Sequence, residues 1–313
     1  MNSREPSISI RSRLGAVPRF DWLMAFASAA VLAISFAGCR LTLIRIPDLA
    51  ATAIGTVLLI PIILLIPIYW HEKGKIDLRD AALTIPWCLI FRFALGYTVA
   101  VAGRLGMNIP LQDELFVRLD HSLGIYVPGF MEWSSHHWFG NFVSSTYPVL
   151  FPMLMVAYFL PALTGKVRAA QQFITSNLIA FAVTVPLFGL FPAVGPWYGY
   201  HLPVTPVQAA CQQSLFLLRT HGPYTLNLFG VVCFPSFHVI WVLLCANSLW
   251  CFKPLRIPVA ILSTLIILST ITGGWHYCVD VLAGLLVAAA AIAASRALSR
   301  WLTPVTAADG NHS

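Results

Sequence analysis

Two histidines and one carboxylate are the residues of this chain best placed to do chemistry. His276 and Asp280 lie four residues apart, and Asp280 is the only carboxylate between Glu132 and Asp309. Residues at positions i and i+4 share one face of a helix, so Asp280 can accept a hydrogen bond from one ring nitrogen of His276. That bond would fix the tautomer and make the other nitrogen more basic, which is the orienting logic of a catalytic triad.

The second histidine follows a helix-start signal in the stretch 234–238, Phe-Pro-Ser-Phe-His. Proline suits the first turn of a helix, and serine is a good N-cap. The apolar spans that begin here and at His276 are expected to run in the same direction, so His238 and His276 should lie at one level of the membrane. Helix N-termini bind phosphate through free N–H groups and a positive dipole end. The arrangement predicts phosphoryl transfer with a histidine nucleophile.

The elements that must position these residues are membrane helices. The 313 residues are 58% hydrophobic and only 10% charged, and the mean hydropathy is +0.78. A typical soluble domain carries about 25% charged residues. The composition predicts a polytopic membrane protein and excludes a soluble enzyme, a secreted scaffold and a disordered chain. The net charge of +7 does not indicate nucleic-acid binding, because the basic residues are scattered between apolar spans.

Eight apolar stretches approach the roughly 20 residues that a helix needs to cross a bilayer. They are residues 21–38, 50–70, 81–103, 141–163, 173–194, 235–252, 257–273 and 276–298. With the N-terminus inside, 13 Lys and Arg residues fall on the inner side and five on the outer side, while Arg92 lies within the third span. This bias places both termini in the cytoplasm. The string from Phe36 to Cys39 is similar to a lipoprotein cleavage box, but the apolar run before it is long for a signal peptide, so we interpret it as the first span.

Two long outer loops complete the expected topology. Residues 104–140 include tryptophans and histidines and are expected to lie at the membrane interface. Residues 195–234 are rich in Gly, Pro, Tyr and Trp and hold Cys211 and Cys233, which would either pair or stay free. The seven cysteines show no CxxC spacing, which argues against a thiolate metal site.

The two histidine motifs resemble the type-2 phosphatidic acid phosphatase (lipid phosphate phosphatase) superfamily. They are Pro-Ser-x-His at 235–238 and, about 40 residues later, His-x3-Asp at 276–280. The longer strings Phe-Pro-Ser-Phe-His and His-Tyr-x2-Asp-Val-x2-Gly look closer to its inositol phosphorylceramide synthase branch, which is of the inositolphosphotransferase type. The stretch 119–124 and a Gly-Pro-Trp-Tyr string resemble segments of the same branch. In that string, Trp197 and Tyr198 would be either substrate contacts or anchors at headgroup level.

This resemblance covers roughly residues 110–298 and implies a fold. The fold is an all-α polytopic membrane helix bundle of about eight transmembrane helices with a six-helix core. N-terminal transmembrane helices would occupy 1–103, a catalytic domain 104–300 and a polar tail 301–313. Membrane lipids would be substrate and acceptor. We expect a bacterial inner membrane with a periplasmic active site, and the oligomeric state stays open.

Carried over residue by residue, the resemblance also implies catalytic roles. His276 would be the nucleophile that forms a phosphohistidine, and Asp280 would orient it. His238 would protonate the leaving oxygen and then activate the acceptor. Ser236 and Pro235 would help to hold the phosphate. The family works without a metal, and we expect no cofactor.

The sequence departs from the phosphatase members in its positive charges. Those members have a Lys-x6-Arg-Pro motif and an Arg six residues before the nucleophile, where this chain has Thr270. Helix N-terminal ends and an arginine on the outer side would then have to neutralise the negative charge of the phosphate. The candidates are Arg104, Arg118 and Arg219. A site with less positive charge suits a substrate with less negative charge, so the departure favours a transferase that handles phosphodiesters.

Three hypotheses for the function follow. The first is a lipid phosphotransferase or phosphatase at the outer leaflet, with phospho-head-group transfer preferred and a simple phosphatidate or isoprenyl phosphate phosphatase as the alternative. The second is a transporter with a polar site at mid-depth, suggested by Arg92 and the proline-broken spans. The third is a metalloenzyme with His238, His276 and Asp280 as ligands. Sensitivity to a chelator separates the third hypothesis from the first.

Overall fold

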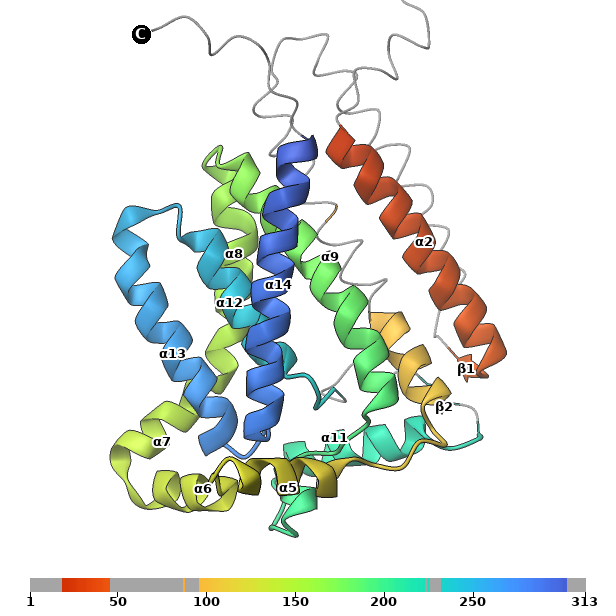
Figure 1. Cartoon of the computed structure of the whole chain (residues 1–313), viewed down its shortest axis with the longest axis vertical. Coiled ribbons are helices and arrows are strands. Elements are labelled where there is room, and N and C mark those ends of the chain that lie inside the picture. The colour runs from red at the N-terminus through yellow and green to blue at the C-terminus, as the bar shows by residue number, and fades with distance from the viewer. Residues whose placement is uncertain (1–18, 46–86, 88–95, 223, 226–231, 303–313) are drawn as a thin grey trace, which may run out of the picture.

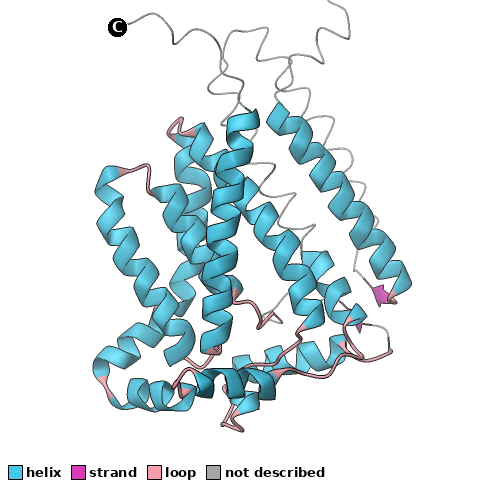
Figure 2. Ribbon diagram, viewed as in Figure 1, coloured by secondary structure: helices cyan, strands magenta, loops and turns pink. Residues whose placement is uncertain are grey.

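The computed structural model of the chain describes residues 19–45, 87, 96–222, 224–225 and 232–302. The expected span 50–70, most of span 81–103, Arg92 and the tail from residue 303 lie outside the described residues. Helices dominate the part that is described, as Figure 2 shows. The exception there is a parallel pairing of two residues each, between β1 (Ile44–Arg45) and β2 (Tyr224–Thr225). Apart from that pairing, the predicted all-α class is confirmed.

The chain forms a bundle of long helices with shorter helices at one end. The elements are, in chain order, α2 (Arg19–Leu41), β1, a helical segment at 96–105, α5 (Asp113–Ser122), α6 (Val127–His136), α7 (Trp138–Ser145), η1 (Tyr147–Val149), α8 (Leu150–Leu163), α9 (Val167–Leu190), α10 (Pro196–Gly199), α11 (Pro206–Leu218), β2, α12 (Phe237–Leu249), η2 (Lys253–Leu255), α13 (Arg256–Thr272) and α14 (Cys278–Leu302). Five stretches of the described chain are long and apolar enough to cross a membrane: Arg19–Leu41, Trp138–Leu163, Val167–Leu190, Lys253–Thr272 and Cys278–Arg300. The protein is therefore a polytopic membrane helix bundle.

The expected sixth span, 235–252, is a short helix. α12 has 13 residues, fewer than the roughly 20 that a free-standing span requires. It begins after Ser236, whose hydroxyl accepts a hydrogen bond from the Val239 N–H at 3.4 Å and so caps the first turn. α12 packs against α8, α9, α13 and α14. Its short length is tolerated because these neighbours, rather than lipid, surround it.

The core of the bundle lies where these five helices meet around α12. Each helix contributes buried apolar side chains, for example Leu154 from α8, Phe173 from α9, Ile240 from α12, Ile266 from α13 and Ala288 from α14. In a membrane, such helices associate through close packing rather than through loss of water. The core therefore fixes the relative positions of α12 and α14, the two helices whose N-terminal ends carry the histidine motifs.

Gly284 lets α12 and α14 approach each other closely. A Cβ atom at this position would lie 2.8 Å from the carbonyl oxygen of Ser236 and 3.1 Å from Cβ of Val239. The backbone N–H of Ser236 also donates a hydrogen bond to the carbonyl oxygen of Asp280 at 3.0 Å. The start of α12 is thus held against the first two turns of α14.

The two ends of the bundle differ. Helices α5, α6 and α11 lie across the lower end in Figure 1. For α5 and α6, this is the arrangement expected of residues 104–140, which were predicted to lie at the membrane interface. The start of α2, the α8–α9 and α12–α13 connections and the end of α14 form the opposite end. That end carries basic residues: Arg19, Lys166, Arg168, Lys253, Arg256, Arg296 and Arg300. That this end faces the cytoplasm stays a prediction.

Candidate active site

His276 and Asp280 contact each other at the start of α14. Nδ1 of His276 lies 3.4 Å from Oδ2 of Asp280, and both side chains are buried. His276 ends the turn that joins α13 to α14, where its backbone N–H and that of Trp275 both donate to the carbonyl oxygen of Thr270. Gly274 has φ of +67° in this turn, a left-handed conformation that favours glycine. The turn thereby places His276 one helical turn before its carboxylate partner.

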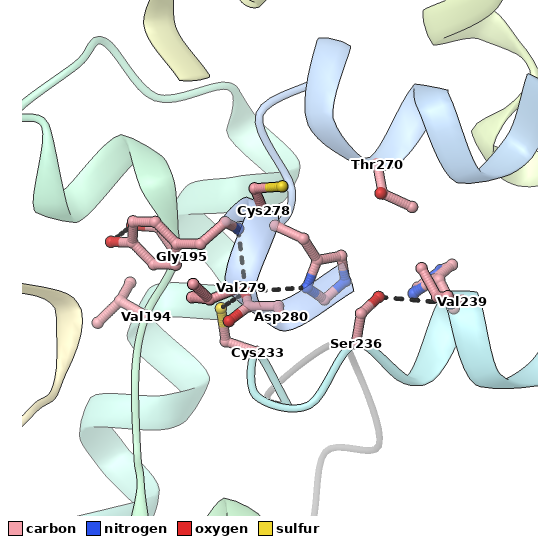
Figure 3. Close-up of polar contacts among 12 residues, drawn as sticks. Val194, Gly195, Cys233, Ser236, Val239, Thr270, Cys278, Val279 and Asp280 are labelled. Atoms are coloured by element: carbon pink, nitrogen blue, oxygen red, sulfur yellow. Dashed lines mark hydrogen bonds and ion pairs between the residues drawn. The ribbon is translucent and has the colours of Figure 1, made fainter. Parts of the chain in front are cut away.

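Asp280 is held by more than His276. Its Oδ2 also accepts hydrogen bonds from the Tyr277 N–H at 3.0 Å and from the thiol of Cys233 at 3.1 Å. Its Oδ1 is buried and has no hydrogen-bond partner among the residues that the structure describes. Figure 3 shows Asp280 beside Cys233, with Ser236 on the neighbouring helix α12. These bonds restrict the rotation of the carboxylate and aim one oxygen at the imidazole.

His238, on the first turn of α12, faces His276 across the site. The two ring centroids are 5.9 Å apart. Nδ1 of His238 lies 3.1 Å from the phenolic oxygen of Tyr147, while Nε2 is buried and has no hydrogen-bond partner in the described chain. Tyr147 stacks on His238 with a centroid distance of 4.2 Å and on Trp275 with 5.0 Å. Aromatic rings from two other elements therefore fix the plane of His238.

The remaining predicted contacts of the substrate lie at different depths. Pro235 and Ser236 are buried directly beside the histidines, and Ser236 serves as the N-cap of α12. Trp197 is also buried, and its ring contacts that of Trp275 at a centroid distance of 5.8 Å. Tyr198 is 38% exposed. Trp197 thus supports the wall of the site, and Tyr198 faces the surface.

Two of the three candidate arginines bind backbone carbonyls. Arg219 donates hydrogen bonds to two carbonyl oxygens in the stretch 106–109. Arg104 donates from Nη1 to the carbonyl oxygen of Gly222 at 2.8 Å, and its Nε and Nη2 are buried without a partner in the described part of the chain. Arg118 is exposed. A role for any of the three in binding phosphate stays a prediction.

Two buried carboxylates of α5 had no place in the sequence-based account of the site. Asp120 accepts hydrogen bonds from the N–H groups of Cys278 and Val279, the first two residues of α14, at 2.9 and 3.0 Å. Asp113 accepts one from the phenol of Tyr277 at 2.9 Å and others from the backbone of 194–195. Burial raises the pKa of both carboxyl groups, and these hydrogen bonds oppose the rise. Sequence spacing gives no sign of such contacts, because they join residues 81 to 164 positions apart.

A metal-ligand set is also present, although it differs from the predicted one. Cys233, His276 and Asp280 each offer a ligand atom, and these atoms lie within 4.8 Å of one another. Burial raises the pKa of the Cys233 thiol well above its ordinary value, and the charge of Asp280 adds to the shift. A protonated thiol is a poor metal ligand. Cys233 and Cys211 are free thiols, so the disulfide considered for them does not form.

The chain also matches a family model, that of the PAP2 superfamily, over residues 114–294. The chain belongs to the PAP2 superfamily. The superfamily consists of phosphatases and phosphotransferases, so with its apolar helices this chain is an integral membrane enzyme of that kind. No curated protein matches the chain significantly, and no solved structure does. The match to the PAP2 superfamily begins in α5 and ends in α14, and it includes both His238 and His276.

Proposed function

We propose that this PAP2-superfamily protein transfers a phospho-head-group between lipids at the outer leaflet, through a phosphohistidine on His276. The observation that supports the proposal is the pairing of His276 with Asp280 at 3.4 Å, beside a second histidine whose ring lies 5.9 Å away. With its Nδ1 proton donated to Asp280, His276 keeps the lone pair of Nε2 for attack on phosphorus. Metal is not required for this step.

The first half of the reaction breaks one phosphoester bond of the donor lipid. Nε2 of His276 forms a bond to phosphorus, and the bond from phosphorus to the lipid oxygen breaks. His238, doubly protonated at the start, gives the proton of its Nε2 to that oxygen, which leaves as an alcohol, and His238 becomes neutral. The products are the alcohol, a phosphohistidine that carries the head group, and a His238 that can now accept a proton.

The second half returns both histidines to their starting state. His238 takes the proton from the hydroxyl of the acceptor lipid, and the acceptor oxygen attacks phosphorus. The bond from phosphorus to Nε2 of His276 breaks, and the new phosphodiester leaves. With water as acceptor the same steps give hydrolysis, so the chemistry of the two histidines does not separate a transferase from a phosphatase.

The distribution of charge supports a phosphodiester substrate. A phosphomonoester carries up to two negative charges, and a phosphodiester carries one. The site offers the N-terminus of α12, capped by Ser236, and Thr270 occupies the position where the phosphatase members have an arginine. Arg219, a candidate for the missing charge, is engaged with backbone carbonyls. We therefore infer that the enzyme is of the inositolphosphotransferase type, with a lipid acceptor such as ceramide or diacylglycerol.

Product analysis tests the proposal. Purified protein in EDTA would be incubated with phosphorus-labelled phosphatidylinositol or phosphatidate, each with and without a ceramide or diacylglycerol acceptor. We expect a labelled lipid that appears only with acceptor, is absent in His276→Ala and persists in His136→Ala. His136 is a matched control because it is an exposed histidine on α6. Free phosphate from phosphatidate without any acceptor-dependent product would contradict the transferase proposal and indicate a lipid phosphate phosphatase.

A further inference from the structure

In the N-terminal turn of α14, the side chain of Asp280 accepts the N–H of Tyr277, the residue before the helix. Cys278 and Val279, its first two residues, instead direct their N–H groups at the carboxylate of Asp120, which lies 158 residues earlier in the chain. A helix N-terminus has unpaired N–H groups and a positive dipole end, and a carboxylate satisfies both. Asp120 is fully buried, so water does not replace it. The start of the nucleophile helix is therefore anchored from a separate element.

Asp113 holds the residue next to His276. Its Oδ1 accepts a hydrogen bond from the phenol of Tyr277 at 2.9 Å, and that phenol also lies 2.9 Å from the carbonyl oxygen of Gly195. The same carboxylate accepts the backbone N–H groups of Val194 and Gly195 at 2.9 to 3.1 Å. Asp113 thus joins the 194–195 loop to the 276–280 segment through one buried group.

The two carboxylates share one face of a single helix. The buried residues of α5 are Asp113, Phe116 and Asp120, which is the spacing of one helical stripe. Between the two acids, the ring of Phe116 contacts Tyr277 at a centroid distance of 5.6 Å. α5 lies across the end of the bundle rather than within it (Figure 1). The buried face of α5 therefore packs against the segment that contains His276.

We propose that Asp113 and Asp120, the α5 carboxylate pair, are positioning residues that set the place of His276 for attack on phosphorus. The inference rests on the proposed function. Neither carboxylate touches the substrate; both act through backbone N–H groups or the Tyr277 phenol. Reacting atoms must meet in a narrow range of geometry, and a displacement of about 1 Å can cost on the order of 100-fold in rate. Burying two acidic side chains in a membrane protein costs free energy, and ionisable groups buried in this way usually have a functional role.

Asp120→Asn and Asp113→Asn test the proposal with little change of volume. Each amide presents an NH2 group where the native carboxylate accepts an N–H, so the anchor is weakened. We expect kcat to fall about 10- to 100-fold while KM for the donor lipid changes less than about twofold, because ground-state contacts with the lipid are unchanged. Tyr277→Phe removes one hydroxyl, and its effect with Asp113→Asn should be less than additive.

Ser176→Ala is the matched control. It removes a buried hydrogen bond of 2.8 Å between Ser176 on α9 and Ser295 on α14, far along α14 from the nucleophile. It should lower the melting temperature in detergent without changing kcat. Normal kcat in folded Asp120→Asn and Asp113→Asn, or an equal loss of kcat in Ser176→Ala, would overturn the proposal.

Hydrogen exchange separates this inference from the proposed function. If the wild type makes no His276-dependent product, the proposed function fails, and the anchor is then judged by the amide exchange of residues 276–281. Faster exchange there in Asp120→Asn, with unchanged exchange in Ser176→Ala, supports the anchor. Exchange equal to that of the wild type overturns it, whether or not the enzyme is active.

Discussion

The phenolic oxygen of Tyr147 lies 3.1 Å from Nδ1 of His238, and the two rings stack with their centroids 4.2 Å apart. His238 acts as a general acid from its doubly protonated form, in which Nδ1–H donates to the phenolic oxygen and Nε2–H is the proton given to the leaving oxygen. Nε2 is buried and without a partner in the described chain. By accepting from Nδ1–H, Tyr147 leaves Nε2 as the nitrogen that gives and takes the proton, and it does so from a segment 91 residues away.

Tyr147→Phe should slow chemistry without weakening lipid binding. The phenylalanine ring keeps the stack between His238 and Trp275, but the hydrogen bond to Nδ1 of His238 is lost. We expect kcat to fall about 10-fold, less than the roughly 100- to 10,000-fold that proton transfer contributes, because His238 itself remains, and we expect KM to be nearly unchanged. Steady-state kinetics on the same lipid measures this. Tyr126→Phe, at an exposed tyrosine, is the control, and an equal effect of the two changes would refute the role of Tyr147.

Gly284→Ala should separate the two histidines. The added carbon would lie 2.8 Å from the Ser236 carbonyl oxygen, so α12 must move away from α14. Overpacking of this kind costs about 1–3 kcal/mol, and we expect a lower melting temperature together with reduced kcat. Gly222→Ala is the control, because a Cβ there would meet, among the residues that the structure describes, only Thr220 Oγ1 at 3.9 Å. A Gly284→Ala protein with normal stability and turnover would show that the close approach is not needed.

Removal of metal should leave turnover intact. The Cys233 thiol donates a hydrogen bond to Oδ2 of Asp280, and Nδ1 of His276 is paired with the same oxygen, so these three ligand atoms already contact one another without a metal. Activity after dialysis against EDTA is the measurement, and we expect the untreated rate. Loss of activity that added Zn²⁺ restores would instead favour the metalloenzyme hypothesis and assign the ion to Cys233, His276 and Asp280.

Labelling of introduced cysteines tests the proposed orientation. Ser122 at the end of α5 and Thr164 in the α8–α9 connection are both exposed, at opposite ends of the bundle. In intact cells, an impermeant maleimide should modify Ser122→Cys and should modify Thr164→Cys only after the membrane is opened. The parent chain supplies the background from native thiols. The reverse pattern would place the histidines on the cytoplasmic side.

Local spacing was enough to identify one half of the site. The i, i+4 relation of His276 and Asp280 is a property of a single helix turn, and the helix-start signal at Pro235 and Ser236 is equally local. The expected common direction of the spans then brought His238 to the same level as His276. The structure places these residues together, and the bundle of apolar helices agrees with the hydropathy pattern.

The rest of the site depends on tertiary contacts that no local pattern encodes. Asp120, Asp113 and Tyr147 reach the histidine motifs from segments 91 to 164 residues away. Asp120 lies in the stretch 119–124 that resembles a family segment, but no pattern in the sequence assigned any of the three a contact with the histidine motifs. Hydropathy also overestimated the sixth span. The predicted span began at Pro235, beside the Ser236 cap, but α12 ends at Leu249 and the chain then turns into η2, so the helix has only 13 residues.

The most direct test of the central claim is to trap the phosphoenzyme. Wild type and Asp280→Asn would be mixed with phosphorus-labelled donor lipid, quenched rapidly under alkaline conditions that preserve phosphohistidine, and digested to locate the label. We predict label on the peptide that contains His276 in the wild type, less label in Asp280→Asn, none in His276→Ala, and release of the label when acceptor lipid is added. A wild type that forms product at full rate without label on His276, or a His276→Ala protein that still forms product, would contradict the phosphohistidine mechanism.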